Sequence, residues 1–170
     1  MLVVADTSPI QYLVLIAEAD VLPKLFGQVF VPKAVIRELN HLNAPQAVRD
    51  FMVGRPGWLT IQDPRRVDPI PGIDLGEQAA ISLARELSAD LLLIDDLDGR
   101  RAAQSLGIAV TGTLGVLERA ADHGLLDLRE SIERLQATSM HLSGRLIVSL
   151  LARRQRPSDS PGDPDVERGS

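Results

Sequence analysis

The 170-residue chain contains no cysteine, few aromatic residues and no long apolar run. The absence of cysteine excludes disulfides, thiolate zinc sites and a cysteine nucleophile. Because aromatic residues make up only 3% of the chain, we expect a core of leucine, valine, isoleucine and alanine. The longest apolar run, residues 12–17, is far too short to cross a bilayer. The first residues show no basic region and no cleavage site, so we expect a cytoplasmic protein.

Positive charge is also scarce. The chain has 18 lysine and arginine residues against 23 acids, which gives a formal net charge of −5 at pH 7. This balance argues against a polybasic nucleic-acid-binding surface over the whole molecule. Its only lysines are Lys24 and Lys33. The three histidines, His41, His123 and His141, are too scattered along the chain to indicate a metal cluster.

Short apolar runs alternate with helical patterns along most of the chain. This alternation predicts an α/β fold of three layers, with a parallel sheet between two layers of helices. A loop rich in proline and charge is expected at 63–72. We expect strands at 2–5, 28–31, 58–61, 89–94 and 108–110, and helices near 7–17, 21–26, 32–39, 44–53, 76–88, 97–106, 113–123, 128–137 and 142–154. Residues 1–154 are then one domain, and 155–170, rich in proline, serine, glycine and aspartate, a disordered tail.

Acidic residues follow the two most apolar strands. Asp6 follows the first strand, and Asp95 and Asp96 follow the fourth; Glu38 and Glu77 lie on helices beside apolar neighbours. Because converging carboxylates repel one another, such a group favours a bound cation, and oxygen donors favour Mg²⁺ or Mn²⁺ over zinc. A carboxylate site of this kind suits metal-assisted hydrolysis of a phosphodiester.

Each acid also has a simpler interpretation. Asp6 can serve as a helix N-cap, and either Asp96 or Asp98 can cap the helix after the fourth strand. Glu38 can be a solvated helix residue. Glu77, in the first turn of its helix, is favoured there by the helix dipole alone. The joint placement of these acids on strand ends and helix starts is a more specific indication of a functional site than any single acid.

The acids lie in five characteristic segments or next to them. These are Asp-Thr-Ser-Pro-Ile at 6–10, Val-Ile-Arg-Glu-Leu at 35–39, Gly-Glu-Gln-Ala-Ala-Ile at 76–81, Leu-Ile-Asp-Asp-Leu-Asp-Gly-Arg-Arg-Ala at 93–102 and Gly-Ile-Ala-Val-Thr-Gly-Thr-Leu-Gly at 107–115. Over roughly residues 1–150, these segments resemble the PIN-domain superfamily, and in particular an uncharacterised PIN-like branch related to VapC toxins. It implies a five-stranded parallel sheet in which the first and fourth strands are neighbours. It also implies a Mg²⁺- or Mn²⁺-dependent endoribonuclease, the toxin of a type II toxin–antitoxin pair, with an RNA substrate, a small antitoxin partner and a homodimeric state.

The resemblance carries residue roles with it. The catalytic and metal-binding acids it implies are Asp6, Glu38, Glu77 and either Asp95 or Asp96, with Asp98 a weaker choice. Thr7 or Ser8 matches the hydroxyl residue that follows the first acid. Arg100 and Arg101, directly after the acid run, are candidates for phosphate contacts, although a solvated helix face explains them equally well. A small basic group lies near the end of the chain and consists of Arg153, Arg154 and Arg156. It can contact RNA or an acidic antitoxin segment, or its positive charges can simply be stabilised by the dipole at the end of a helix.

Two other functional classes stay open. A catalytically inactive PIN-like module would act through protein partners and bind no metal. A phosphate-receiving signalling domain also places acids at strand ends, but it needs a lysine late in the fold, and both lysines here come early.

Overall fold

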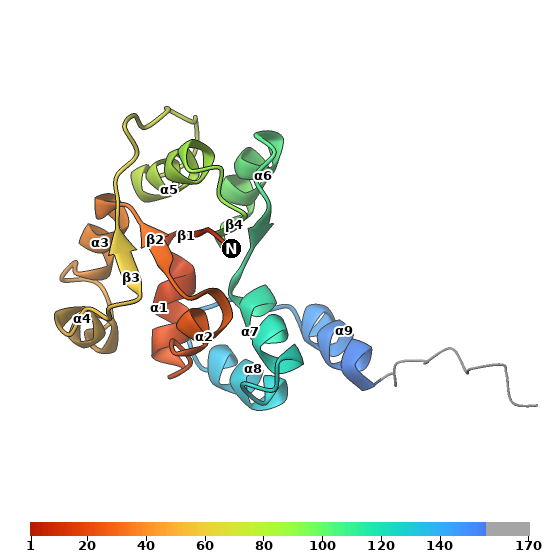
Figure 1. Ribbon diagram of the computed structural model, residues 1–170. Coiled ribbons are helices and arrows are strands. Elements are labelled where there is room, and N and C mark those ends of the chain that lie inside the picture. Colours follow the sequence, from red (N-terminus) through yellow and green to blue (C-terminus); the bar gives the residue numbers. More distant parts are fainter. Residues whose placement is uncertain (156–170) are drawn as a thin grey trace, which may run out of the picture. The chain divides into compact units, whose positions relative to one another are not determined.

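The computed structural model describes residues 1–155. It separates the chain into two compact units, Met1–Met140 and a second unit that begins at His141. The first unit contains a five-stranded parallel sheet in the order β3-β2-β1-β4-β5 (Figure 1). The strands are β1 (Val3–Ala5), β2 (Val29–Val31), β3 (Leu59–Ile61), β4 (Leu91–Leu93) and β5 (Val110–Thr111). Both the α/β class and the neighbouring positions of the first and fourth strands are therefore confirmed.

The central strands are short and completely apolar because they are covered on both faces. Val3, Val4 and Ala5 are fully buried, as are Leu92 and Leu93. A strand that packs against helices on both sides shows a continuous apolar run rather than an alternating pattern. This burial explains why both strands could be recognised from sequence.

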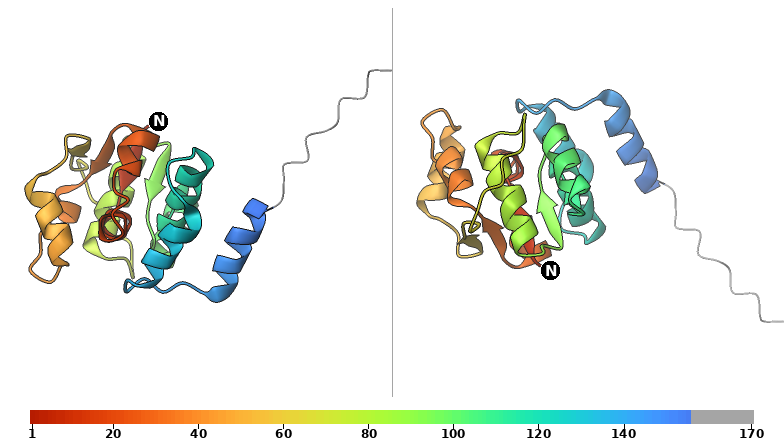
Figure 2. Two further views of the ribbon diagram at one scale, coloured as in Figure 1. Left: turned by 90° about the horizontal axis from the view of Figure 1, so that it is seen from below. Right: turned by 90° about the horizontal axis from the view of Figure 1, so that it is seen from above.

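Helices form the two outer layers of the first unit (Figures 1 and 2). One face of the sheet carries α5 (Leu75–Glu86) and α6 (Leu97–Ser105). The other face carries α1 (Thr7–Leu15), α2 (Val21–Phe26), α7 (Thr113–Asp122) and α8 (Leu128–Gln136). Helices α3 (Lys33–Leu39) and α4 (Gln46–Val53) lie on the side of β2 and β3. In the described part of the chain, no helix has the length and apolarity that a membrane span requires.

The expected elements are all found, with small shifts at their ends. The largest shortening concerns the fourth strand, expected over 89–94 and observed over 91–93. Ser88 has a positive φ of 49°, and Ala89 donates its N–H to the carbonyl of Ala84, so the end of α5 occupies the residues just before the strand. The expected loop at 63–72 contains neither helix nor strand.

The second unit contains α9 (Gly144–Gln155). The structure divides the chain after residue 140, whereas the expected domain ends at residue 154. The expected domain organisation therefore stays a prediction. Gln155, expected to begin the tail, is the last residue of α9, and residues 156–170 of that expected tail lie outside the described residues.

The order of the strands determines where a site can form. The chain leaves β1 toward one edge of the sheet and enters β4 on the other side of β1, so the order reverses between these two strands. Ala5 pairs with Leu93, which places the residues after both strands side by side. In open α/β sheets this carboxyl-end crevice is the usual place for ligands.

Candidate active site

Asp6 lies at the point where the strand order reverses. Its backbone N–H donates to the carbonyl of Leu93 at 2.9 Å, so its main chain extends the pairing of β1 with β4. The residue occupies the N-cap position of α1, but its side chain makes no capping hydrogen bond. It is 4% exposed, and its Oδ1 is buried without a hydrogen-bond partner within residues 1–155. The simpler N-cap interpretation therefore does not account for this carboxylate.

Glu38 reaches the same region from α3. The Thr7 hydroxyl donates a hydrogen bond to its Oε2, which ties α3 to the first turn of α1. On the other side, a Cβ placed on Gly76 would lie 2.8 Å from the Glu38 Cδ. The carboxylate thus fills the space that a side chain at position 76 would need, and three helices fix its position.

Glu77 lies in the first turn of α5 and is 9% exposed. Its backbone N–H donates to Oδ1 of Asp74, the N-cap residue of α5, at 2.9 Å. A Cβ built on Gly99, in the first turn of α6, would lie 3.5 Å from the Glu77 Oε2, so this carboxylate lies against the start of the helix that follows β4. Asp74 was not among the residues predicted from the sequence, although an aspartate three residues before a glutamate is a capping pattern that indicates such a position.

The pKa values of the two buried acids are raised. The pKa of Asp6 is raised to about 8, chiefly by burial and in part by the charges of Glu77, Glu38 and Asp74, against the opposing effect of a hydrogen bond from the Thr7 backbone. The pKa of Glu77 is raised to about 7, chiefly by burial and in part by repulsion from Asp74, Asp96 and Glu38. These acids therefore share one field of negative charge, and we call Asp6, Glu38, Asp74, Glu77 and Asp96 the acid cluster.

Asp95 and Asp96 are adjacent in sequence but have different surroundings. Asp95 accepts hydrogen bonds from both the backbone N–H and the hydroxyl of Thr113, each at 2.7 Å. Burial raises the pKa of Asp95, whereas the Thr113 hydrogen bonds and the Arg100 charge lower it. Asp96 caps α6 through a 2.9 Å hydrogen bond from the Gly99 N–H, and its charge acts on Glu77. Asp96 thus belongs to the acid cluster, while Asp95 joins the end of β4 to the start of α7.

The remaining sequence candidates differ in their surroundings. Arg100 is half-buried beside Asp95, whereas Arg101 is exposed and forms an ion pair with Asp98 at 3.5 Å. Ser8 is half-buried in the first turn of α1. Arg153 and Arg154 lie on α9 in the second unit, and Arg156 lies outside the described residues.

The acid cluster offers oxygen donors suited to a hard divalent cation. Within residues 1–155, no three acidic or histidine side chains already converge into a ready-made metal site. Mg²⁺ does not need such a cage, because it keeps several waters and is commonly held by one or two carboxylates. The unpartnered Oδ1 of Asp6 and the raised pKa of Glu77 are what an uncompensated group of carboxylates shows. The residues present therefore fit Mg²⁺ or Mn²⁺.

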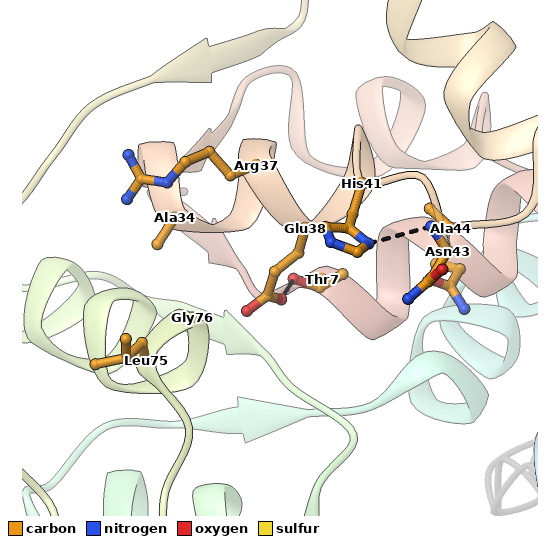
Figure 3. A pocket seen from close by; sticks show the side chains of 10 residues that line it. Thr7, Ala34, Arg37, Glu38, His41, Asn43, Ala44, Leu75 and Gly76 are labelled. Carbon is orange, nitrogen blue, oxygen red and sulfur yellow. Dashed lines mark hydrogen bonds between the residues drawn. The ribbon is translucent and has the colours of Figure 1, made fainter.

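A cleft with a volume of about 470 Å³ opens beside the acid cluster. Glu38 belongs to the acid cluster and also lines the cleft, next to Thr7, which donates a hydrogen bond to it (Figure 3). We call this space the α3 cleft, and its lining consists of Thr7, Gln11, Ala34, Arg37, Glu38, His41, Asn43, Ala44, Leu75 and Gly76. No sequence pattern indicated it, because its walls come from α1, α3, the segment after α3, and α5.

Comparisons with known proteins agree with this architecture. A structural search matches a PilT N-terminus domain protein from the hyperthermophilic archaeon Sulfolobus solfataricus with a TM-score of 0.52 and 16% identity, covering 84% of this chain and all of the other. At that identity the match concerns the fold alone. No curated protein matches the sequence. The model of the family described as "DUF3368: PIN domain" matches residues 2–156, nearly the whole described chain. The chain therefore belongs to this PIN-domain family.

Proposed function

We propose that this protein is a metal-dependent endoribonuclease that hydrolyses RNA phosphodiester bonds with Mg²⁺ or Mn²⁺ at the acid cluster. PIN domains are commonly nucleases, which supports the general class. The observation that carries the proposal for this chain is the Asp6 carboxylate. It is buried, has an oxygen without a partner in the described residues, and shares its charge field with Glu77 at the reversal of strand order. A carboxylate in that state costs free energy unless a cation or a proton compensates it.

Different residues of the site have different roles in this proposal. Asp6, Glu77 and Asp96 hold the divalent ion, whose chemistry is to stabilise negative charge on the phosphate and to acidify water. Glu38, oriented by the Thr7 hydroxyl and by the close approach of Gly76, accepts a proton or hydrogen-bonds the attacking water. Arg100, half-buried beside Asp95, contacts a phosphate of the substrate. Asp95 is a positioning residue that holds β4 against α7 through Thr113.

An RNA-cleavage assay tests this proposal. The wild-type protein is expected to cleave single-stranded RNA with Mg²⁺ or Mn²⁺ and to lose the activity in EDTA. Glu77→Gln keeps the size of the side chain but removes its charge, so cleavage should fall by at least about a hundredfold. Glu133→Gln, on the exposed side of α8, is the matched control and should retain full activity. Full activity of Glu77→Gln, or activity of the wild type in EDTA, would refute the proposed site.

We extend the proposal to the toxin of a type II toxin–antitoxin pair, acting as a cytoplasmic homodimer with a small antitoxin. The support is the resemblance of the sequence motifs to VapC toxins. Expression of the wild type should arrest growth, and Glu77→Gln should not. Light scattering tests the dimer, and co-purification with the product of a neighbouring small gene tests the antitoxin.

One observation favours a second candidate, a catalytically inactive binding module. In the described part of the chain, no three potential ligands are already arranged around a common point. A protein that binds a partner but neither binds Mn²⁺ nor cleaves RNA would establish this alternative.

A further inference from the structure

The α3 cleft has the size and chemistry of a small-ligand site. Its volume of about 470 Å³ falls within the ~300–1,000 Å³ of typical ligand pockets. Figure 3 shows Glu38 and Thr7 in the middle of the lining, with Arg37 on one side and His41 and Asn43 on the other. A ligand in the α3 cleft would therefore touch the acid cluster at Glu38 and extend away from it along α3.

The polar groups of this lining can donate and accept hydrogen bonds toward a ligand. Arg37 is exposed and forms no ion pair within the described residues. His41 accepts the Asn43 backbone N–H through its Nδ1 at 3.1 Å, which leaves Nε2 as the donor of the neutral ring. The side-chain amides of Gln11 and Asn43 each offer both donors and an acceptor.

The same lining also contains apolar surface. Leu75, 75% exposed in the first turn of α5, faces the α3 cleft together with Ala34 and Ala44. A flat aromatic ring can pack on such a surface while its edge forms hydrogen bonds with the side-chain amides of the lining. Unpaired RNA bases are recognised in this way, by contact with a base face and by hydrogen bonds to its edge. A bidentate amide contact also discriminates between bases.

We propose that the α3 cleft binds one unpaired nucleotide of single-stranded RNA, next to the phosphodiester at the acid cluster, and selects its base. This inference rests on the proposed function, which places the bond that is cut at the acid cluster. Asn43 and Gln11 read the base edge, and Arg37 holds a neighbouring phosphate. The protein is therefore a base-selective nuclease rather than one that accepts every sequence.

Cleavage of a randomised pool of short oligoribonucleotides in Mn²⁺, followed by sequencing of the products, tests the inference. The wild type should show a base preference at one position beside the cut. Asn43→Ala and Gln11→Ala should reduce that preference about fivefold, which corresponds to one lost hydrogen bond. Arg37→Ala should slow the cleavage of all sequences about tenfold without changing the preference. Gln136→Ala and Arg129→Ala, exposed on α8 and outside the lining, are the matched controls.

A binding arm separates this inference from the proposed function. Fluorescence anisotropy in EDTA measures the affinity for a labelled tetranucleotide without any cleavage. If the wild type does not cut RNA but Asn43→Ala and Arg37→Ala bind the tetranucleotide several-fold more weakly than the controls, the nuclease proposal fails and the nucleotide site is supported. The inference is overturned if the cleavage profiles of Asn43→Ala and Gln11→Ala equal that of the wild type. It is equally overturned if no tetranucleotide binds, as expected for a cleft that receives a protein partner.

Discussion

Gly76 lies so close to the carboxylate of Glu38 that the space between them cannot hold a side chain. The first turn of α5 and the last turn of α3 therefore approach each other at the acid cluster, and a Cβ at position 76 would lie 2.8 Å from the Glu38 Cδ. The glycine is not needed for an unusual backbone conformation, since its φ is not among the positive values of this chain. The absence of a side chain at position 76 leaves room for the Glu38 carboxylate.

Gly76→Ala should displace Glu38 while the helix itself tolerates the change. Alanine stabilises a helix by roughly 0.5–1 kcal/mol relative to glycine, which offsets part of the steric cost. We expect RNA cleavage to fall about tenfold or more, because a small displacement of a reacting group is costly, with the melting temperature nearly unchanged. Gly144→Ala, where nothing lies within 4 Å of the added methyl group, is the control and should change neither quantity.

The hydroxyl of Thr7 should matter more than its methyl group. Thr7→Val removes the donor that orients Glu38, whereas Thr7→Ser keeps it. Loss of one hydrogen bond to a carboxylate corresponds to about 1.5–3 kcal/mol, so Thr7→Val should lower kcat at least tenfold, and Thr7→Ser should retain most of the activity. Equal activity of both variants would show that Glu38 needs no orientation by α1.

The raised pKa of Asp6 gives the stability of the metal-free protein an unusual pH dependence. The folded protein holds the Asp6 proton up to about pH 8, whereas the unfolded chain releases it near its ordinary value of 3.8. Stability contributed by this proton is therefore fully present at low pH and is lost as the pH rises from about 4 to 8.

Asp6→Asn should remove this dependence and, in EDTA at pH 8, raise the free energy of unfolding by about 1–3 kcal/mol. Chemical denaturation at pH 5.5 and pH 8 measures the effect, with Asp98→Asn, an exposed residue on α6, as the control. Parallel pH profiles for Asp6→Asn and the wild type would contradict the assigned environment of Asp6.

Mn²⁺ binding should strengthen as the pH rises through 7 to 8. A cation competes with the protons of Glu77, whose pKa is about 7, and of Asp6, whose pKa is about 8. Binding should therefore release protons below pH 8. Calorimetry in two buffers of different ionisation enthalpy counts these protons. Binding that is independent of pH between 6 and 8 would exclude both acids as ligands.

Mutation of Asp95 should lower the stability of the fold, whereas mutation of Asp96 should weaken metal binding. Asp95→Ala leaves the N–H and hydroxyl of the fully buried Thr113 without their partner, so we expect a loss of about 2–3 kcal/mol in stability. Asp96→Asn keeps a good N-cap for α6 and should scarcely change stability. It should instead weaken Mn²⁺ binding several-fold, because it removes a charge beside Glu77. Denaturation and calorimetry on both variants measure these two effects. A stability loss for Asp96→Asn and weaker Mn²⁺ binding for Asp95→Ala alone would contradict the assigned roles.

The fold was predictable because its signals are local. Continuous apolar strands such as Val3–Ala5 and glycines with positive φ, such as Gly107 after α6, mark the elements without any knowledge of their neighbours. The position of Asp6 beside the carboxyl end of β4 was also predictable, since it follows from the neighbouring positions of the first and fourth strands and from the geometry of parallel strands.

The details of the site depend on contacts between distant segments. The different surroundings of Asp95 and Asp96 depend on Thr113, 18 residues after Asp95, which donates hydrogen bonds to both oxygens of Asp95. Asp74 was not predicted as part of the site because it follows a loop rich in proline and charge, where an isolated acid is common. The α3 cleft has no sequence signature, since Gln11, Arg37 and Leu75 come together only when α1, α3 and α5 pack.

A divalent cation at the acid cluster is the central feature of the proposed function, and a crystal soaked in MnCl₂ tests for it most directly. Anomalous scattering from manganese should give a peak about 2–2.5 Å from carboxylate oxygens of Asp6 and Glu77, and the peak should vanish in Glu77→Gln crystals. A crystal whose only manganese peaks lie on surface acids such as Asp98, with no manganese beside Asp6, would contradict the proposed metal site.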